Sequence, residues 1–312
     1  METSNRQIAF TPDLFEPAQR NAQEAEKITG PPTSFWGDAW RRLKRNRVAV
    51  FAGGVILLIL ALAVAGPWLT PYTPTEQVLE RQYTSPSLSG FWFGTDEFGR
   101  SMFDRVWVGT RVSLYIAALV TVMDIGVGMS YGAISGFYGG RVDNIMQRII
   151  EILVGIPILI VAVLTMLILE PGILSLSIAI GLVVWTTSAR LIRGQVLKLK
   201  EQEFFLASRS LGAGTFRLIS KHLLPNVFYI VIITLMYTVP TAVFFEAFLS
   251  FIGLGIQPPN ASLGALINDG AKQMQLTPHL LVFPAIVLSL LTVGFRLLGD
   301  GLRDALDPRM RK

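Results

Sequence analysis

The sequence contains no cysteine and only two histidines, His222 and His279, among its 312 residues. Without cysteine, the chain forms no disulfide, no thiolate metal site and no cysteine nucleophile. It also lacks the H-E-x-x-H pattern of a zinc hydrolase and the G-x-x-x-x-G-K-[ST] loop that cradles nucleotide phosphates. These absences argue against a hydrolase, and they predict no catalytic residue, no metal site and no cofactor bound by this chain.

Charge is also scarce, because only 16% of the residues are charged while 51% are apolar and the mean hydropathy is +0.50. Such a composition is too apolar for a soluble globular protein. Six stretches have little or no charge and reach, or nearly reach, the length that crosses a hydrocarbon core of about 30 Å. They run over residues 48–66, 112–137, 152–169, 173–189, 227–245 and 280–295. Backbone groups in lipid must be satisfied within the segment. The sequence therefore predicts an all-α polytopic membrane protein with six transmembrane helices.

The positive charges predict the orientation of these helices. Six spans would place all but five of the 27 Lys and Arg residues on one side of the membrane. The exceptions are Arg81, Arg100, Arg105, Arg111 and Lys272. The positive-inside rule predicts that the basic side, with both termini and the loop 190–226, is cytoplasmic. The pI of 9.6 then reflects topology, and no nucleic-acid partner is expected. The first apolar run, from Val48, is interpreted as a signal anchor.

The remaining segments complete the predicted organisation. Trp36 and Trp40 lie opposite a basic face, which predicts an amphipathic helix in the lipid interface; a basic flank that stops transfer is the alternative. The predicted parts are a flexible cytoplasmic tail (1–33), this interfacial helix (34–47), the first transmembrane helix (48–70), an external segment (71–111), a five-helix core (112–300) that contains the loop 190–226, and a cytoplasmic C-terminal tail (301–312).

The external segment contains the stretch FGTDEFGRSMFDRVWVGTRVSL, residues 93–114. Thr95 or Asp96 is positioned to cap a short helix, and Asp96 with Arg100 has the i,i+4 spacing of a surface ion pair. One interpretation is a capped helix that fixes where the second span begins. The other is direct contact of Asp96, Arg100 and Arg105 with an external partner.

Glycine recurs at every fourth residue near the end of the second span, at Gly128, Gly132, Gly136 and Gly140. Residues at this spacing share one helix face, where small side chains let another helix approach closely. We expect this face to pack against a helix of the same subunit, with packing between two subunits as the alternative.

One acidic residue, Asp124, lies inside a predicted span, and another, Glu246, lies at the end of the fifth span, where the external interface is expected. A carboxylate in the membrane costs roughly 2.5–3.5 kcal/mol on insertion scales, so it should face the bundle interior or water. Asp124 either lines the path of a substrate with a positively charged N-terminus or hydrogen-bonds to a neighbouring helix. Glu246 either shapes a gate or is a surface acid that reaches the interface.

The loop from Glu203 to Asn226 reads EFFLASRSLGAGTFRLISKHLLPN and is polar between two apolar spans. The Gly212-Ala213-Gly214 sequence should end a helix over 203–211, and Thr215 is positioned to cap a second helix that runs to Leu224, where Pro225 marks the turn into the fifth span. Small side chains at Ala207 and Ser208 allow the first helix to enter a groove of another protein. The loop is therefore predicted to be a docking element that transmits force from a soluble partner, with a helix lying on the membrane as the alternative.

This loop resembles the coupling motif of ABC importer permeases, which is Glu-Ala-Ala, three residues, Gly, nine residues, Ile, one residue and Leu-Pro. The corresponding residues here are Leu206-Ala207-Ser208, Gly212, His222 and Leu224-Pro225. Leu206, Ser208 and His222 depart from the motif, and Glu203 supplies an acidic group one turn earlier. The KHLLPN variant, residues 93–114 and the stretch FEAFLSFIGLGIQPPNASLGALINDG (245–270) are similar to the C subunits of oligopeptide and dipeptide permeases. Ser101 and Asp104 stand in exchanged order relative to that family.

The resemblance implies a type I ABC importer permease fold in a bacterial cell membrane, with the chain forming half of a translocation pore for oligopeptides. It also implies four kinds of partner besides peptide and lipid: a B-type permease, two ATPase subunits (D- and F-type) that bind ATP and Mg, and an extracellular or periplasmic binding protein. The missing phosphate-binding loop agrees with hydrolysis by partner subunits. The alternatives are an ABC permease for nickel or another small solute, and a secondary transporter, for which Asp124 alone is thin support.

Overall fold

The computed structural model describes residues 35–306, so the predicted tail 1–33 and residues 307–312 lie outside the described part of the chain. The chain divides into two compact units, Met1–Asp38 and Ala39–Lys312. Only the first turn of helix α2 is described in the first unit, and the account below concerns the second unit. Within the described residues the regular secondary structure is helical, apart from one isolated β-bridge between Thr95 and Ser101, and irregular loops connect the helices.

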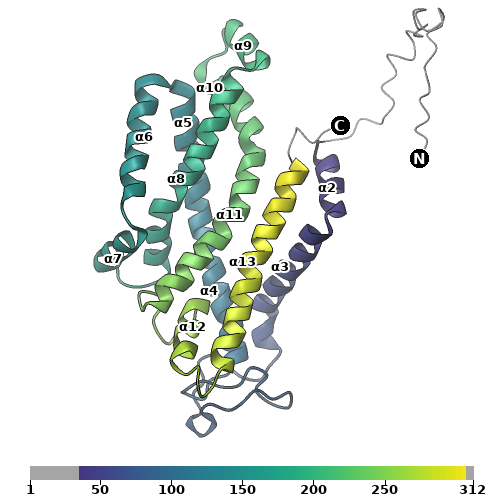
Figure 1. The fold of residues 1–312 in the computed structure, drawn as a ribbon, viewed down its shortest axis with the longest axis vertical. Helices are drawn as coiled ribbons and strands as arrows, with labels where there is room; N and C mark the ends of the chain where they lie inside the picture. The colour runs from purple at the N-terminus through teal and green to yellow at the C-terminus, as the bar shows by residue number, and fades with distance from the viewer. Residues whose placement is uncertain (1–34, 307–312) are drawn as a thin grey trace, which may run out of the picture. The chain divides into compact units, whose positions relative to one another are not determined.

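Figure 1 shows the order of the helices along the chain. The elements are α2 (Phe35–Arg45), α3 (Arg47–Ala65), two 3-10 turns (Gly66–Trp68 and Leu79–Arg81), α4 (Met102–Met123), the π-helix η4 (Asp124–Met129), α5 (Ser130–Tyr138), α6 (Gly140–Gly155), α7 (Ile158–Ile168), α8 (Ile173–Lys200), α9 (Glu203–Ser210), α10 (Thr215–Arg217), the π-helix η5 (Leu218–Leu223), α11 (Leu224–Phe251), α12 (Leu263–Lys272) and α13 (His279–Leu306).

Five helical segments of the described chain are long and apolar enough to cross a membrane. They are Arg47–Trp68, Met102–Tyr138, Ile173–Lys200, Thr215–Phe251 and His279–Leu306. A sixth span results if α6 and α7 count as one, although they are bent by 85° at their junction. The prediction of an all-α polytopic membrane protein is thereby confirmed.

The predicted third span, 152–169, is wrong as a single helix. Helix α6 ends at Gly155 and α7 begins at Ile158. Pro157 causes the break, because proline has no N–H to donate and forces the preceding residue out of the helical region. Ile156 is accordingly extended, with φ −88° and ψ 121°.

Several other predicted boundaries are also wrong. Asn46 caps α3 by accepting the N–H of Ala49 at 3.1 Å, so the predicted helix 34–47 ends at Arg45 and the first span begins at Arg47. Helix α4 begins at Met102, inside the segment expected to be external, because its first turns are buried against the core. Helix α13 continues to Leu306, so residues 301–306 belong to this helix and not to a tail. A Cβ on Gly301 would lie 2.3 Å from the Cβ of Ala49, so the close contact between α13 and α3 explains the glycine.

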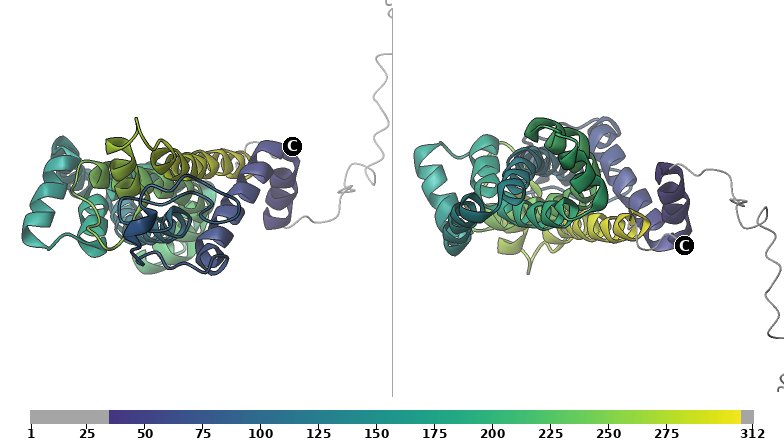
Figure 2. Two further views of the ribbon diagram at one scale, coloured as in Figure 1. Left: turned by 90° about the horizontal axis from the view of Figure 1, so that it is seen from below. Right: turned by 90° about the horizontal axis from the view of Figure 1, so that it is seen from above.

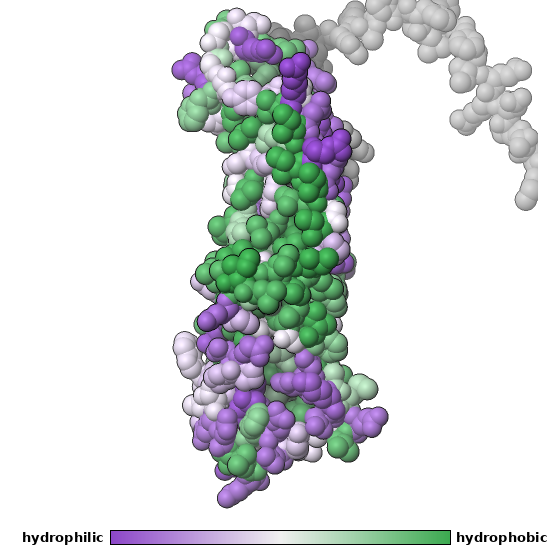
Figure 3. Space-filling model, turned by 90° about the vertical axis from the view of Figure 1, so that its left-hand side faces the viewer, coloured by the Kyte–Doolittle hydropathy of each residue, from purple (hydrophilic) through white to green (hydrophobic). Residues whose placement is uncertain are grey.

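Helix α11 occupies the middle of the bundle and packs against α4, α8 and α13. Helix α3 packs along α13 at one edge, and α6 lies at the opposite edge (Figure 2). The face that carries α6 and α7 is hydrophobic in the middle and hydrophilic at both ends, as a membrane-spanning surface requires (Figure 3). We call the end of the bundle that carries α9 the α9 end, and the end that carries α12 the α12 end (Figure 1).

Candidate functional site

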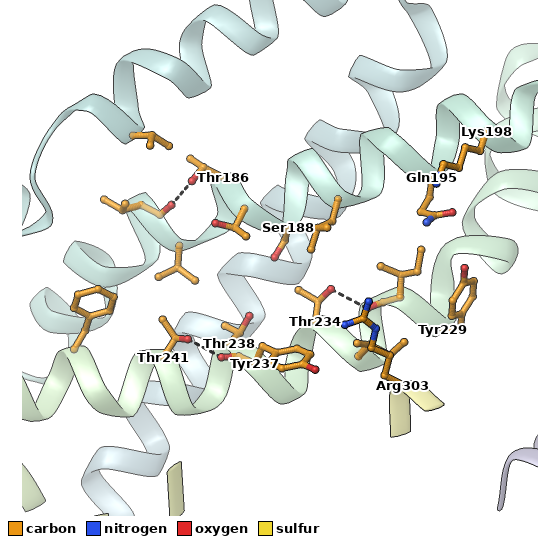
Figure 4. Close-up of a pocket in the computed structure, with 18 of the residues that line it drawn as sticks. Thr186, Ser188, Gln195, Lys198, Tyr229, Thr234, Tyr237, Thr238, Thr241 and Arg303 are labelled. Atoms are coloured by element: carbon orange, nitrogen blue, oxygen red, sulfur yellow. Dashed lines mark hydrogen bonds between the residues drawn. The ribbon is translucent and has the colours of Figure 1, made fainter. Parts of the chain in front are cut away.

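A large groove lies between α8 and α11, with a volume of about 1170 Å³. The junction of α6 and α7, the start of α9 and Arg303 of α13 complete its lining. Figure 4 shows polar side chains of α8 and α11 facing each other across this space. Among the described residues that line this groove, the charged side chains are two cations, Lys198 and Arg303.

Hydroxyl groups line the middle of the groove. Thr234, Thr238 and Thr241 lie on one face of α11, and Thr186 and Ser188 lie on α8 (Figure 4). Residues three or four apart share a helix face, so the threonine spacing on α11 follows from the helical period. The groove therefore combines apolar walls with a row of hydroxyls from two helices.

Asp124 lies directly behind this row. Its side chain is 1% exposed, and its Oδ2 atom accepts a hydrogen bond from the Thr238 hydroxyl. Its Oδ1 atom has no hydrogen-bond partner within the described chain. The wider π turn of η4 begins at Asp124, and such turns often occur at functional sites. The structure thus places Asp124 against the neighbouring helix and adjacent to the groove, so both interpretations of this residue fit.

Three of the four repeated glycines face α8. A Cβ would lie 3.0 Å from Trp185 O at Gly128, 2.4 Å from Ala189 O at Gly132, and 2.9 Å from Val196 Cβ at Gly136. Close helix contact within one subunit therefore explains these three residues. Gly140 differs, because it begins α6 with φ +52° and nothing lies within 4 Å of a Cβ built there.

The loop at the α9 end has the predicted helix–glycine–helix arrangement. Helix α9 ends in a Schellman motif, in which Ala213 N–H bonds to Ser208 O at 3.1 Å and Gly212 N–H bonds to Arg209 O at 3.0 Å. Gly212 occupies the left-handed position of this motif, with φ +80°. The glycine is therefore required by backbone geometry.

One side of this loop is buried and the other is exposed. Phe205 packs with Leu218, Leu223 and other apolar residues of a separate core cluster, which joins α9 to the start of α11. In contrast, Leu211 is 89% and Phe216 is 84% exposed. Sequence reasoning missed these two residues, although large apolar side chains that flank a glycine turn in a polar loop were visible. Of the predicted motif residues, Glu203, Leu206, Ala207 and Pro225 are exposed, Ser208, His222 and Leu224 are half-buried, and Gly212 is exposed.

Two details of the predicted loop are wrong. Thr215 is the first residue of α10, and the residue at the cap is Gly214, with no side-chain hydrogen bond. The chain does not turn at Pro225, because the helical segment runs without a break from Thr215 to Phe251. Pro225 is the second residue of α11, and the π turn of η5 directly precedes it.

At the α12 end, Glu246 is completely buried, so the prediction of a surface acid is wrong. Its carboxylate accepts hydrogen bonds from Ser113 of α4 at 2.6 Å and from Ser250 of α11 at 2.8 Å. Ser113 Oγ also accepts the N–H of Leu263 at 3.3 Å, and Ser262 caps α12 through Ala265 N–H. This network fixes the start of α12 to α4 and α11.

The ion pair of Asp96 with Arg100 exists, with 2.7 Å between Oδ2 and Nε, but it is buried and does not lie on a helix. Arg105 Nε lies 3.4 Å from the same oxygen, and Arg105 is only 2% exposed. The predicted short helix is absent from this described segment because Gly94 and Gly99 adopt φ of +76° and +72°. The predicted surface pair is therefore a buried cluster that shapes the loop.

A further ion pair, which is partly buried, was missed. Arg193 donates two hydrogen bonds of 2.5 Å to Asp143, which also accepts one from Ser135. The pair joins α6 to α8 across fifty residues of sequence, and neither residue stands out in a local pattern. Bidentate arginine–carboxylate pairs are strong and geometrically specific.

The comparisons with known proteins agree with this architecture. Residues 128–312 match the family described as binding-protein-dependent transport system inner membrane component, and residues 34–86 match the N-terminal TM domain of oligopeptide transport permease C. The dipeptide transport system permease protein DppC of Bacillus subtilis is 45% identical over 94% of this chain and 92% of its own length. The oligopeptide transport system permease protein OppC of the same organism is 44% identical, over 96% and 98%.

A more distant relative is the glutathione transport system permease protein GsiD of Pectobacterium atrosepticum, 34% identical over 88% of this chain and 92% of its own length. Among solved structures, a chain of the MetNI methionine ABC transporter in an inward-facing conformation is 20% identical, with a TM-score of 0.52 over 66% of this chain and 98% of that chain. At this identity the likeness shows the fold alone, which is that of an ABC importer permease.

The chain thus has the fold of the transmembrane subunit of a bacterial ABC importer, a multi-pass, non-catalytic permease. It belongs to the family of binding-protein-dependent transport system inner membrane components, and within that family it is an OppC- and DppC-like permease.

Proposed function

We propose that this chain is the permease component of a bacterial oligopeptide or dipeptide ABC importer and forms one half of the translocation path. The observation that carries this proposal is the groove between α8 and α11, which combines hydroxyl groups with apolar walls in a chain whose relatives are named as peptide permeases. A B-type permease would contribute the facing half of the path, and Asp124 would lie beside it.

The groove favours a peptide over nickel or another small solute. Its lining residues include no carboxylate, histidine or methionine, which are the side chains that would bind a metal ion. A peptide instead offers apolar side chains and amide groups, which match apolar walls with interspersed hydroxyls. The relatives named for dipeptide, oligopeptide and glutathione transport agree with this choice.

The distribution of Lys and Arg supports a cytoplasmic α9 end, which carries the loop 190–226 and the beginning of α3. Two ATPase subunits, of D and F type, would dock at the cytoplasmic side of the importer, where they would bind ATP and Mg and hydrolyse the nucleotide. We assign their contact to α9 and its glycine turn, where Leu211 and Phe216 offer exposed apolar anchors and the cap at Gly212 fixes the loop. Leu206, Ala207 and Ser208 face the same partner, while His222 and Leu224-Pro225 join the loop to α11.

The α12 end would then face the binding protein that delivers the peptide. Asp96, Arg100 and Arg105 are buried, so their role is to hold the turn that exposes Glu97 and Phe98. Arg100 also lies 4.6 Å from the centre of the Phe98 ring. Glu246 fixes α12 beside this surface and in this way shapes the outer gate.

Reconstitution of the complete importer in proteoliposomes tests the proposal. ATP-dependent uptake of a tripeptide that requires the binding protein, and that is lost when this chain is omitted, is the expected result. Uptake of nickel but not of any peptide by the same preparation would overturn the assignment of substrate. Uptake driven by an ion gradient without ATP would overturn the assignment of mechanism.

A further inference from the structure

Four of the five threonines that line the groove share a chemical property beyond their polarity; the fifth is Thr187. Each of four donates its hydroxyl hydrogen into the wall: Thr186 to Val183 O (2.7 Å), Thr234 to Ile230 O (2.8 Å), Thr241 to Tyr237 O (2.7 Å) and Thr238 to Asp124 Oδ2. Figure 4 draws three of these bonds as dashed lines, those made by Thr186, Thr234 and Thr241. A backbone carbonyl oxygen is an acceptor only, so the direction of the bonds made by Thr186, Thr234 and Thr241 is fixed; toward Asp124, Thr238 is the donor when the carboxyl group is ionised.

A hydroxyl group has one hydrogen and two lone pairs. Once the hydrogen is committed to the wall, the oxygen can act only as an acceptor toward the groove. Thr238 is the clearest case, because its partner Asp124 is a buried carboxylate that belongs to another helix. An ionised Asp124 therefore holds Thr238 as an acceptor toward the groove from another helix.

We propose that this row of threonines recognises the main-chain N–H groups of the translocating peptide. The inference rests on the proposed function, and it specifies how the groove binds its substrate. Every peptide carries main-chain N–H donors whatever its sequence, and a donor without a partner in an apolar space costs free energy. Hydrogen-bond acceptors along the groove satisfy these donors whatever side chains the peptide carries. Asp124 is the positioning residue for this row.

Hydroxyl bonds to the preceding turn are common in membrane helices, so the bond alone does not define a site. The structure supplies the comparison within this chain. Thr110 and Thr121 of α4 are buried and make the same bond, to Val106 O and Ala117 O, but they do not line the groove. Only threonines that border the groove should affect the substrate.

The test uses the complete importer in proteoliposomes, with trialanine and its two analogues in which one amide is replaced by an ester. Replacing an amide by an ester removes one main-chain N–H donor and leaves the shape of the peptide nearly unchanged. Uptake is measured at concentrations that saturate the binding protein, and the amide-to-ester ratio is compared between permease variants. Because the binding protein is the same throughout, its own preference cancels in this comparison.

For at least one analogue, Thr238→Val should lower the amide-to-ester ratio by about 2- to 13-fold, the value of one net hydrogen bond. Thr238→Ser should retain the ratio, because serine keeps the acceptor. The matched controls Thr110→Val and Thr121→Val should leave it unchanged. Asp124→Asn should lower the ratio by no more than Thr238→Val, and the double variant should show no further loss, since Asp124 acts through that hydroxyl.

An unchanged ratio for both analogues in Thr234→Val, Thr238→Val and Thr241→Val would overturn the inference while leaving peptide import intact. Equal changes in the control variants would also overturn it, since any buried threonine would then have the effect. Failure of the wild-type importer to take up trialanine at all would instead overturn the proposed function.

Discussion

The glycine face of the second span gives the sharpest test of the packing. In Gly132→Ala the added methyl group would lie 2.4 Å from Ala189 O, a backbone atom of α8. Backbone atoms cannot rotate away, so α5 and α8 must separate. Overpacking of this kind typically costs 1–3 kcal/mol. Gly194→Ala is the matched control, because it makes the same change on α8 where nothing lies within 4 Å of the new methyl group.

Thermal unfolding of the purified complex, followed by tryptophan fluorescence, measures the difference between the two variants. At about 2.1 cal/mol/K per residue, a chain of 312 residues shifts its Tm by roughly 1.5 °C for each kcal/mol. Gly132→Ala should therefore lower Tm by about 1.5–4.5 °C. Gly194→Ala should leave Tm unchanged or raise it slightly, since alanine is the better helix former. Equal Tm values for the two variants would refute the assignment of the glycine face to contact with α8.

Two predictions concern the loop at the α9 end. Gly212→Ala forces an L-residue into a left-handed conformation, which costs about 1–2 kcal/mol, and should weaken peptide-stimulated ATP hydrolysis. Gly214→Ala is the control and should leave this hydrolysis unchanged, because Gly214 has φ −66° and nothing lies within 4 Å of a Cβ built there. Leu211→Ala and Phe216→Ala should reduce co-purification of the ATPase subunits without changing the Tm of the permease, whereas Leu276→Ala, equally exposed (82%) but at the α12 end, should have no effect. Equal ATPase recovery in all three would count against the docking surface.

The features that the sequence predicts well are those determined locally. Long apolar runs give the spans, because length and hydrophobicity alone decide them. The helix end at Gly212 follows from residue type, since only glycine adopts that conformation without strain. The helix break at Pro157 is also determined locally, by the proline itself. It was not predicted because the span was assigned from its hydropathy alone. The pairing of Asp96 with Arg100 was predicted correctly, but its location on a surface helix was not. The segment forms a loop because Gly94 and Gly99 adopt left-handed conformations.

The features that the sequence does not predict depend on distant residues. The hydrogen bond from Ser113 to Glu246 spans 133 positions, and that from Thr238 to Asp124 spans 114. The lining of the groove requires knowledge of which faces of α8 and α11 point toward each other, and hydropathy gives no such direction. The helical period of α11 shows that Thr234, Thr238 and Thr241 share a face, but not what that face meets.

The structure also connects the loop to the groove without a relay of side chains. Helical structure runs without a break from Thr215 to Phe251, so Phe216 of the loop lies on the same helical segment as Thr234, Thr238 and Thr241 of the groove. At 1.5 Å per residue, Thr238 lies roughly 35 Å from Thr215 along this axis. Phe205 packs against Leu218 and thus fastens α9 to the base of the same segment. If the ATPase displaces α9 as we propose, we expect α11 to tilt with it and to move Thr234, Thr238 and Thr241 in the groove.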